Sequence, residues 1–170
     1  MARVKPSTPD PIAEARRQWV SHGWVDAAAG MTAVTSIMRA HQLMLARVDE
    51  TLKPHGLSFA RYELLTLLSF TRDGRMPVTS AARRLQVHQT SVTNTVDRLE
   101  AAGLVRREPH PTDGRATLVV LTDDGRARAE EATAELNREV FANPGLDADD
   151  VESLIDTISR LRAASGDVTA

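Results

Sequence analysis

The fold is decided by residues 78–122, which read VTSAARRLQVHQTSVTNTVDRLEAAGLVRREPHPTDGRATLVVLT. Apolar residues recur there at helical spacing, which predicts a short helix, a turn and a second helix over residues 80–102. Gly103 can end the second helix in a left-handed conformation. Branched residues over 105–108 and 116–121 then predict two strands joined by a loop that contains Pro and Gly. The predicted order is therefore helix, turn, helix and β-hairpin.

The helix predicted over residues 89–102 has an apolar face and a polar face. Val92, Val96 and Leu99 recur at i, i+4 and i+7 and form the buried stripe. The opposite face carries short polar side chains instead of the Lys and Glu that are typical of a solvated helix. Such side chains can hydrogen-bond base edges in the major groove, which admits a helix. We therefore predict binding to double-stranded DNA, with a merely polar surface as the alternative. The outward residues are Gln89, Thr90, Thr93, Asn94 and Asp97.

Residues around this helix complete the predicted interface. Polar and basic side chains on the preceding helix can bond phosphates and fix the register without reading sequence. At the hairpin tip, Arg115 can enter a narrow minor groove and Asp113 can hold its guanidinium. An exposed ion pair of little energetic value is the alternative for these two residues. The full predicted DNA-binding set is Thr79, Ser80, Arg83, Arg84, His88, Gln89, Thr90, Ser91, Thr93, Asn94, Arg98, Asp113 and Arg115.

Composition restricts the remaining classes of function. The chain has 170 residues, of which 42% are hydrophobic and 26% charged, as in an ordinary globular protein. It contains no cysteine, which excludes disulfides, a catalytic thiol and cysteine-containing zinc sites. It has no apolar run of the roughly 18 residues that a membrane span needs, nor the apolar region of a signal peptide. We expect a cytoplasmic, nucleoid-associated protein.

The charge is unevenly distributed although the formal net charge is only −2. Residues 79–115 contain six arginines and four acidic residues, a net charge of +2. Residues 141–157 contain five acidic residues and no Lys or Arg, a net charge of −5. This distribution suits a protein that meets a polyanion with one face only.

The flanking segments predict further helices and a mainly α, α+β winged helix-turn-helix fold. Residues 1–30 are predicted to form an N-terminal arm with an extra helix, which Asp10 caps, and residues 57–121 the DNA-binding lobe. Residues 31–56 and 122–165 are predicted to form a helical dimerisation region within one overall domain. The apolar stripes of these helices exceed what the small lobe can cover, which predicts a homodimer. The expected helices are 10–23, 32–53, 58–70, 122–142 and 147–163.

Other kinds of site find little support in the residues. The five histidines are scattered, with no i, i+4 pair, and no nucleophile elbow or phosphate-binding loop is present. We therefore expect no metal, no cofactor and no enzymatic activity. An enzyme with an incidental winged helix is the less favoured alternative, and a winged helix that binds protein instead of DNA stays possible. His41 is either buried and hydrogen-bonded or in contact with a ligand.

The run TSVTNTVDRLEAAGLVRR, followed by PTDGRATLVVLTDDG, resembles the winged helix-turn-helix of the MarR family of bacterial transcriptional regulators. The family's diagnostic motif is Asp-x-Arg, an apolar strand and Leu-Thr. Here Asp-x-Arg stands at residues 113–115 and Leu-Thr at residues 121–122, with the apolar strand between them. The similarity covers about residues 31–163 in element order. It implies a ligand-responsive repressor that binds a pseudo-palindromic operator as a homodimer, with recognition helix 89–102 and Arg115 in the minor groove. It also implies an effector pocket between the dimer helices and the lobe, at Met38, His41, Leu45, Tyr62 and Glu63.

Two features depart from the family pattern. His88 stands where the family often has Ser or Asp as the cap of the recognition helix, so the cap is expected to be weaker or sensitive to pH. The extra helix at 10–23 is found in some members, including the urate-responsive branch. That branch pairs a Trp on this helix with an Asp. Here Trp19 or Trp24 can match the Trp, but the corresponding carboxylate is Glu63.

Overall fold

The computed structural model describes residues 9–113 and 116–167. The chain divides into two compact units, residues 1–50 and residues 51–170. The boundary between them falls inside the long helix α2 (Val25–Leu52), so each unit is described by itself.

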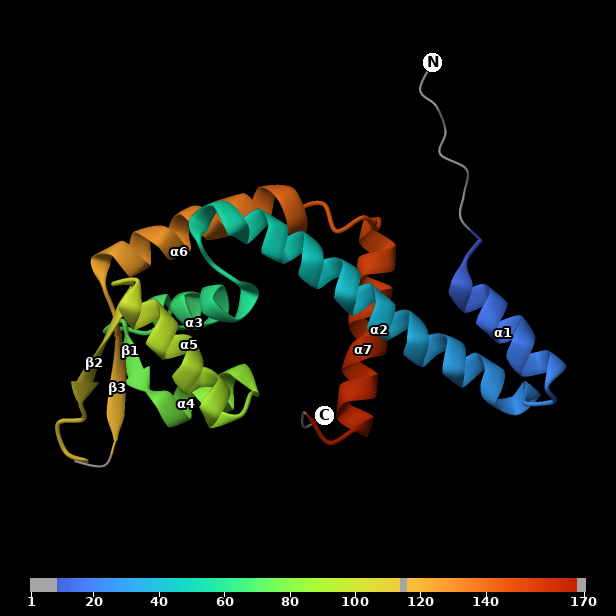
Figure 1. Cartoon of the computed structure of the whole chain (residues 1–170), viewed down its shortest axis with the longest axis horizontal. Coiled ribbons are helices and arrows are strands. Elements are labelled where there is room, and N and C mark those ends of the chain that lie inside the picture. The colour runs from blue at the N-terminus through green and yellow to red at the C-terminus, as the bar shows by residue number, and fades with distance from the viewer. Residues whose placement is uncertain (1–8, 114–115, 168–170) are drawn as a thin grey trace, which may run out of the picture. The chain divides into compact units, whose positions relative to one another are not determined.

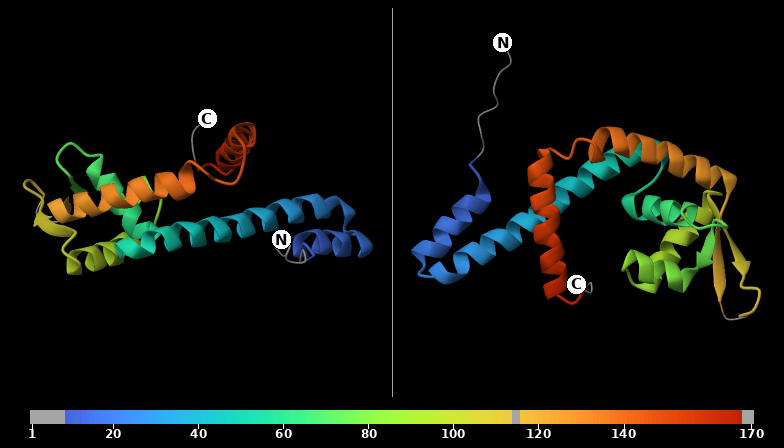
Figure 2. Two further views of the ribbon diagram at one scale, coloured as in Figure 1. Left: turned by 90° about the horizontal axis from the view of Figure 1, so that it is seen from above. Right: turned by 180° about the vertical axis from the view of Figure 1, so that it is seen from behind.

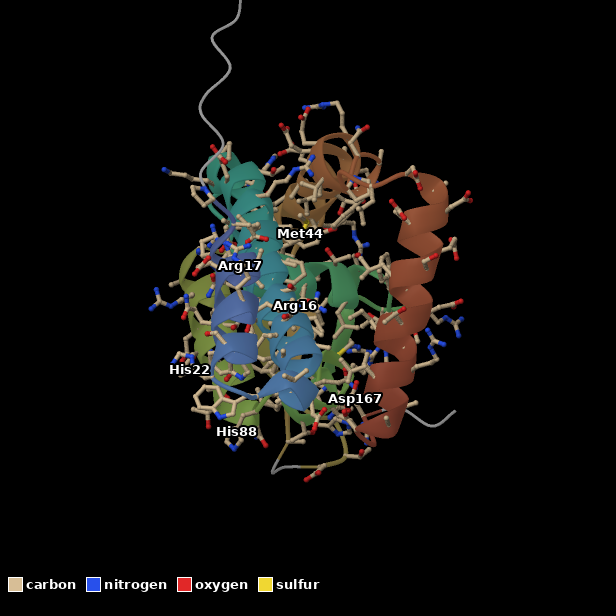
Figure 3. The ribbon with its side chains drawn as sticks, turned by 90° about the vertical axis from the view of Figure 1, so that its right-hand side faces the viewer. Arg16, Arg17, His22, Met44, His88 and Asp167 are labelled. Carbon is tan, nitrogen blue, oxygen red and sulfur yellow. The ribbon has the colours of Figure 1, made fainter. Side chains whose placement is uncertain are left out.

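The first unit is a helical hairpin made of α1 (Pro11–Ser21) and the greater part of α2. Asp10 caps α1, and its Oδ1 accepts the backbone N–H of Ile12 at 2.9 Å, as the sequence predicts. Gly23 has φ +82° and supplies the left-handed turn between the two helices (Figure 2).

Helix α2 begins at Val25, seven residues before the predicted start at Thr32. Residues 27–29 are alanines, the strongest helix formers, and they continue the helix from the turn. Gly30 costs about 1 kcal/mol relative to Ala inside a helix, which is not enough to interrupt it. The predicted boundary between the N-terminal arm (1–30) and the dimerisation region (31–56) therefore falls within one continuous helix.

The second unit contains the helix-turn-helix and a small sheet (Figure 1). The sheet has three antiparallel strands in the order β1-β3-β2, with Met76 paired to Val119 and Arg107 paired to the same residue from the other side. The mainly α fold with a small antiparallel sheet is the predicted class. In chain order, the elements are η1 (Lys53–His55), α3 (Phe59–Ser69), β1 (Arg75–Pro77), α4 (Val78–Leu85), α5 (Gln89–Ala101), β2 (Val105–Pro109), β3 (Thr117–Leu121), α6 (Asp123–Leu136), the π-helical turn η2 (Asn137–Phe141) and α7 (Ala148–Ala164).

The core of this unit lies between α3, α5, the sheet and α6. Each fully buried Leu or Val side chain contributes about 1.5–3 kcal/mol relative to an exposed one. Helix α3 is apolar nearly all round and supplies the centre of this core, as predicted. The largest fully buried side chains are Leu52, Leu64, Leu65, Leu68, Val92, Val96, Leu99, Val105, Val119 and Leu136.

Gly125 permits the close approach of α6 to the end of the helix-turn-helix. A Cβ at this position would lie 2.0 Å from the carbonyl oxygen of Leu104. The start of α6 is further fixed by Thr122, whose Oγ1 donates to the carbonyl of Gly103 at 2.8 Å and accepts the N–H of Gly125 at 3.0 Å. Thr122 therefore caps α6 and also joins this helix to the end of α5.

Ser58 precedes α3, but its hydroxyl does not cap the helix, and its Oγ accepts from Nε of Arg61 at 3.2 Å. Two predicted helix bounds need correction. Helix α4 begins at Val78, two residues before the predicted start, because Pro77 has the extended backbone of an N-cap residue. The α-helical part of α6 ends at Leu136 and continues as a π-helical turn. In the described ranges no helix has the length and hydropathy needed to cross a membrane.

Candidate nucleic-acid interface

The turn between α4 and α5 places the second helix of the motif. Gln86 ends α4 in the left-handed region at φ 55°. The N–H of Val87 donates to the carbonyl of Ala82 at 3.1 Å and closes the turn. Ala81 and Ala82 are buried beneath α5, so small residues at these positions let the two helices approach closely. The exposed face of α5 is thereby fixed by the core on its other side.

His88 caps α5 with its imidazole ring. Its Nδ1 accepts the backbone N–H of Thr90 at 3.2 Å, while its carbonyl accepts the N–H of Ser91 at 2.9 Å. Only an unprotonated Nδ1 can accept a hydrogen bond. The ring of His88 therefore caps α5 as an acceptor where the family often has Ser or Asp, and the dependence of this cap on pH stays a prediction.

The polar face of α5 lies opposite the buried stripe, as predicted. Gln89, Thr90 and Asn94 are exposed, and Thr93 is half-buried. The Thr93 hydroxyl donates to the carbonyl of Gln89 at 3.1 Å, so its proton is used within the helix and its oxygen can still accept. No described residue bonds the Asn94 amide. Its donor and acceptor are available together, as bidentate contact with adenine requires.

Asp97 has a different role from the one its position on the helix suggested. Nη2 of Arg107, on strand β2, donates to Oδ1 of Asp97 at 2.5 Å. Arg107 also donates to Glu100, through its backbone N–H at 2.9 Å and through Nη1. Burial by itself would lower the pKa of the Arg107 guanidinium, but the hydrogen bonds and charges of these two carboxylates raise it overall. Arg107 therefore ties the base of the hairpin to α5.

These pairs change the charge distribution expected from the sequence. Arg106 pairs with Glu108 at 2.7 Å, and Arg107 pairs with two acids, so neither contributes much free positive charge. Arg75 lies 4.0 Å from Glu108 and 3.8 Å from Asp73. In the part of the chain that the structure describes, four arginines of the lobe near α4 and α5 have no carboxylate within 4.0 Å. They are Arg61, Arg83, Arg84 and Arg98.

The hairpin tip is organised by His110. Its Nδ1 accepts the backbone N–H groups of Thr112 at 3.4 Å and Asp113 at 3.2 Å. The carbonyl of Asp113 accepts the N–H of Ala116 at 3.0 Å and closes the loop. Arg115 lies outside the described residues, so its pairing with Asp113 and its place in a minor groove stay predictions.

Two hollows flank the exposed face of α5. One, of about 200 Å³, lies on the hairpin side and is lined by Val78, Thr79, Gln89, Thr93 and Arg107, among others. The other, of about 260 Å³, lies on the α3 side. The predicted DNA-binding residues of α4 agree with this arrangement: Thr79, Arg83 and Arg84 are exposed, and Ser80 is half-buried. The residues that line the second hollow are Ser58, Arg61, Asn94, Thr95 and Arg98.

The two lobe residues of the predicted effector pocket have different surroundings. Tyr62 is buried, and its hydroxyl lies 3.1 Å from Oγ1 of Thr133 on α6. Glu63 instead lines a small, mostly apolar hollow of about 60 Å³ between α3, α4 and α5. Burial there raises the pKa of the Glu63 carboxyl above its usual range. The two side chains therefore have different neighbours in the single chain, and their meeting in one effector pocket stays a prediction.

The remaining residues of that pocket belong to α2. His41 is exposed, which does not fit the buried alternative in the single chain, and its contact with a ligand stays a prediction. Met38 is 61% exposed, and Leu45 is half-buried. Met38 lines a hollow of about 390 Å³ between α1 and α2. Trp19 and Trp24 contact each other edge to face at 5.2 Å beside the turn. The pocket as a whole stays a prediction.

Known proteins share both the motif and the fold. The model of the MarR family matches residues 55–116. Sco5413 of Streptomyces coelicolor, described as a MarR family transcriptional regulator, is 46% identical, with 84% of this chain and 99% of that chain covered and a TM-score of 0.76. Sco3205 of the same organism, a MarR family regulator solved in complex with DNA, is 26% identical, with 78% and 85% covered and a TM-score of 0.67.

Curated relatives agree with the solved structures. The HTH-type transcriptional regulator YdgJ of Bacillus subtilis is 36% identical over 110 residues, which is 63% of this chain and 65% of that protein. The chain spans between 46% and 65% of the length of the first curated relatives that it matches. The near-complete match to Sco5413 carries the assignment, since it includes the flanking helices as well as the lobe. The chain belongs to the MarR family.

Proposed function

We propose that the protein is a transcriptional regulator that binds double-stranded DNA by placing α5 in the major groove. The observation that carries this proposal is the exposed polar face of α5, whose opposite face is locked into the core by Val92, Val96 and Leu99. A helix held in this way keeps Gln89 and Asn94 in fixed positions, and fixed positions are what sequence readout needs. The DNA complex of Sco3205 favours DNA over a protein partner for this surface.

The interface residues fall into three groups, according to the part of the DNA duplex that each group is proposed to contact. Gln89, Thr90, Thr93 and Asn94 read base edges. The α4 residues Thr79, Ser80, Arg83 and Arg84 bond the phosphate backbone, which adds affinity and register without sequence preference. Arg115 at the hairpin tip enters the minor groove, where a narrow groove concentrates negative potential. Because the target is chromosomal DNA, the protein acts in the cytoplasm.

We propose that the functional form is a homodimer. Helix α7 buries none of its residues in the single chain, and Leu154, Ile155 and Leu161 are each about half exposed. Helix α2 likewise exposes Val34, Ile37, Met38, Leu43 and Met44. Monomeric proteins rarely leave such stripes open, and a second copy covers both. The two-fold symmetry then requires a pseudo-palindromic operator with half-sites about one helical turn apart.

We also propose that the dimer is a repressor that responds to a small molecule. An effector changes DNA affinity only if it binds more tightly to one spacing of the two recognition helices than to another. The residues Met38, His41, Leu45, Tyr62 and Glu63 are the proposed contacts. Isothermal titration with candidate effectors, in the presence and absence of operator, measures this coupling from both directions.

DNA binding is tested by fluorescence anisotropy with duplexes from the intergenic region upstream of the gene, each titrated at several salt concentrations. We expect affinity to fall steeply as salt rises. Arg115→Ala should cut affinity on every duplex, whereas Asn94→Ala should lower the preference for the operator over random duplex. Glu130→Ala, at an exposed position of α6, is the matched control. Absence of binding at low salt, or indifference to Arg115→Ala on every duplex, would contradict the proposal.

A further inference from the structure

The hollow between α3 and α5 holds two arginines from different helices. Arg61 comes from the first turn of α3, which lies outside the helix-turn-helix, and Arg98 comes from the second half of α5. Asn94 lines the same hollow, one helical turn before Arg98. The hollow therefore joins the face proposed to read bases to a helix of the hydrophobic core.

Neither guanidinium is neutralised within the described chain. No described carboxylate lies within 4.0 Å of Arg61 or Arg98, although Arg106 and Arg107 of the same lobe are paired. Nε of Arg61 donates to the hydroxyl of Ser58 at 3.2 Å, which leaves its terminal nitrogens unpaired. Two positive charges in one hollow repel each other, and a bound anion would offset that repulsion.

The place of the hollow on α5 indicates which anion fits. The buried stripe of α5 faces the core, and Asn94 and Arg98 lie on the flank of its exposed face that adjoins α3. A helix in the major groove, which is about 12 Å wide, has a sugar-phosphate wall along each flank. The hollow would meet the wall on the α3 side, while the hollow beside the hairpin would meet the other.

We propose that Arg61 and Arg98 together bind one phosphodiester of the DNA backbone beside the half-site that α5 reads. The planar guanidinium donates two parallel N–H groups, which match phosphate oxygens, and Ser58 holds Arg61 in place for this contact. Because α3 is packed in the core, the contact sets how deeply α5 sits in the groove. The inference rests on the proposed function and adds a phosphate contact from α3, which lies outside the helix-turn-helix.

The site is tested with Arg61→Gln, Arg98→Gln and the double variant, each titrated with operator and random duplex at several salt concentrations. We expect each single variant to weaken binding about tenfold at low salt, on both duplexes alike, and to lower the salt slope by about one. Because both side chains hold the same phosphate, the double variant should lose little more than either single variant. Arg72→Gln, an exposed arginine before β1, is the control.

A second measurement identifies the phosphate itself. The backbone phosphates flanking the half-site are replaced one at a time by neutral methylphosphonates. At one position, wild-type protein and Arg61→Gln should bind equally well, because the charge that Arg61 contacts has gone. Thermal melting of each variant checks that the lobe stays folded.

The possible failures are distinguishable. If wild-type protein binds no duplex at low salt, the proposed DNA-binding function fails and the phosphate site fails with it. If wild-type protein binds with a steep salt dependence and Arg61→Gln matches it in affinity and slope, only the phosphate site is overturned. Fully additive losses in the double variant would likewise contradict a single shared phosphate.

Discussion

The lobe and helix α7 carry similar apolar stripes but bury them very differently. In the lobe, α3 and α5 bury Leu64, Leu65 and Leu99 almost completely. In α7, the apolar residues Leu154, Ile155 and Leu161 recur at helical spacing, yet about half of each stays exposed. The periodicity of a sequence therefore predicts that an apolar stripe will be buried. It does not show whether the residues that bury the stripe belong to the same chain or to a second one.

This difference separates two kinds of stability. The lobe is stabilised by its own core, so its folding should not depend on concentration. Helix α7 buries none of its residues within its own chain, although Nη2 of Arg162 contacts Oε1 of Gln86 at 3.4 Å. The proposed dimer should therefore add stability to α7 and to the exposed stripe of α2, and that added stability should depend on protein concentration. The same substitution in the two regions should then give different results.

The largest effect is expected for truncation in the lobe. Leu65→Ala removes a fully buried side chain of α3 and leaves a cavity, which should cost about 2–5 kcal/mol of unfolding free energy. Leu154→Ala, the same change at a half-exposed position of α7, should cost much less at low protein concentration, where dimer is scarce. Urea unfolding at low and high protein concentrations measures both. Equal losses at low concentration would mean that α7 is covered within one chain.

A charge on the exposed stripe of α7 should break the proposed dimer and leave the lobe folded. Ile155→Asp places a carboxylate where a second copy would pack, and burying an unpaired charge is costly. We expect the mass measured by light scattering to fall from that of a dimer to that of a monomer, with operator affinity falling more than tenfold. Circular dichroism checks that the lobe stays folded. Thr157→Asp, an exposed polar position of the same helix, is the control, and a dimer that survives Ile155→Asp would contradict this interface.

The sequence predicted what local signals determine. The ends of α5, its buried stripe, the hairpin and the cap at Asp10 agree with the structure, because each depends on residues a few positions apart. The start of α2 was placed seven residues too late, because the alanines at 27–29 continue the helix through Gly30. The sequence left open whether His41 is buried or contacts a ligand, because a helical stripe does not show what covers it, and His41 is exposed in the single chain.

The candidate site was predicted less completely than the fold. Asp97 and Glu100 lie three residues apart on α5, but their partner Arg107 is on a strand, and only the folded hairpin brings it to them. Two acids at this spacing before a basic strand are a signal that the sequence does contain. No comparable signal marks Arg61, because its position beside Arg98 depends on the packing of α3 against α5.

The smallest expected effect concerns an acid at the edge of the lobe core. Burial raises the pKa of Glu63, so its ionised form disfavours the folded state. The stability that comes from the protonated carboxyl is fully present below its ordinary value of 4.5, and it is lost as the pH rises through the raised pKa. Glu63→Gln should therefore raise the urea midpoint at about pH 7 and match the wild-type protein at about pH 4. Glu152→Gln, at an exposed position of α7, controls for the change in net charge. A urea midpoint that Glu63→Gln lowers at neutral pH would contradict this prediction. It would mean that a partner in the folded protein stabilises the ionised carboxyl of Glu63.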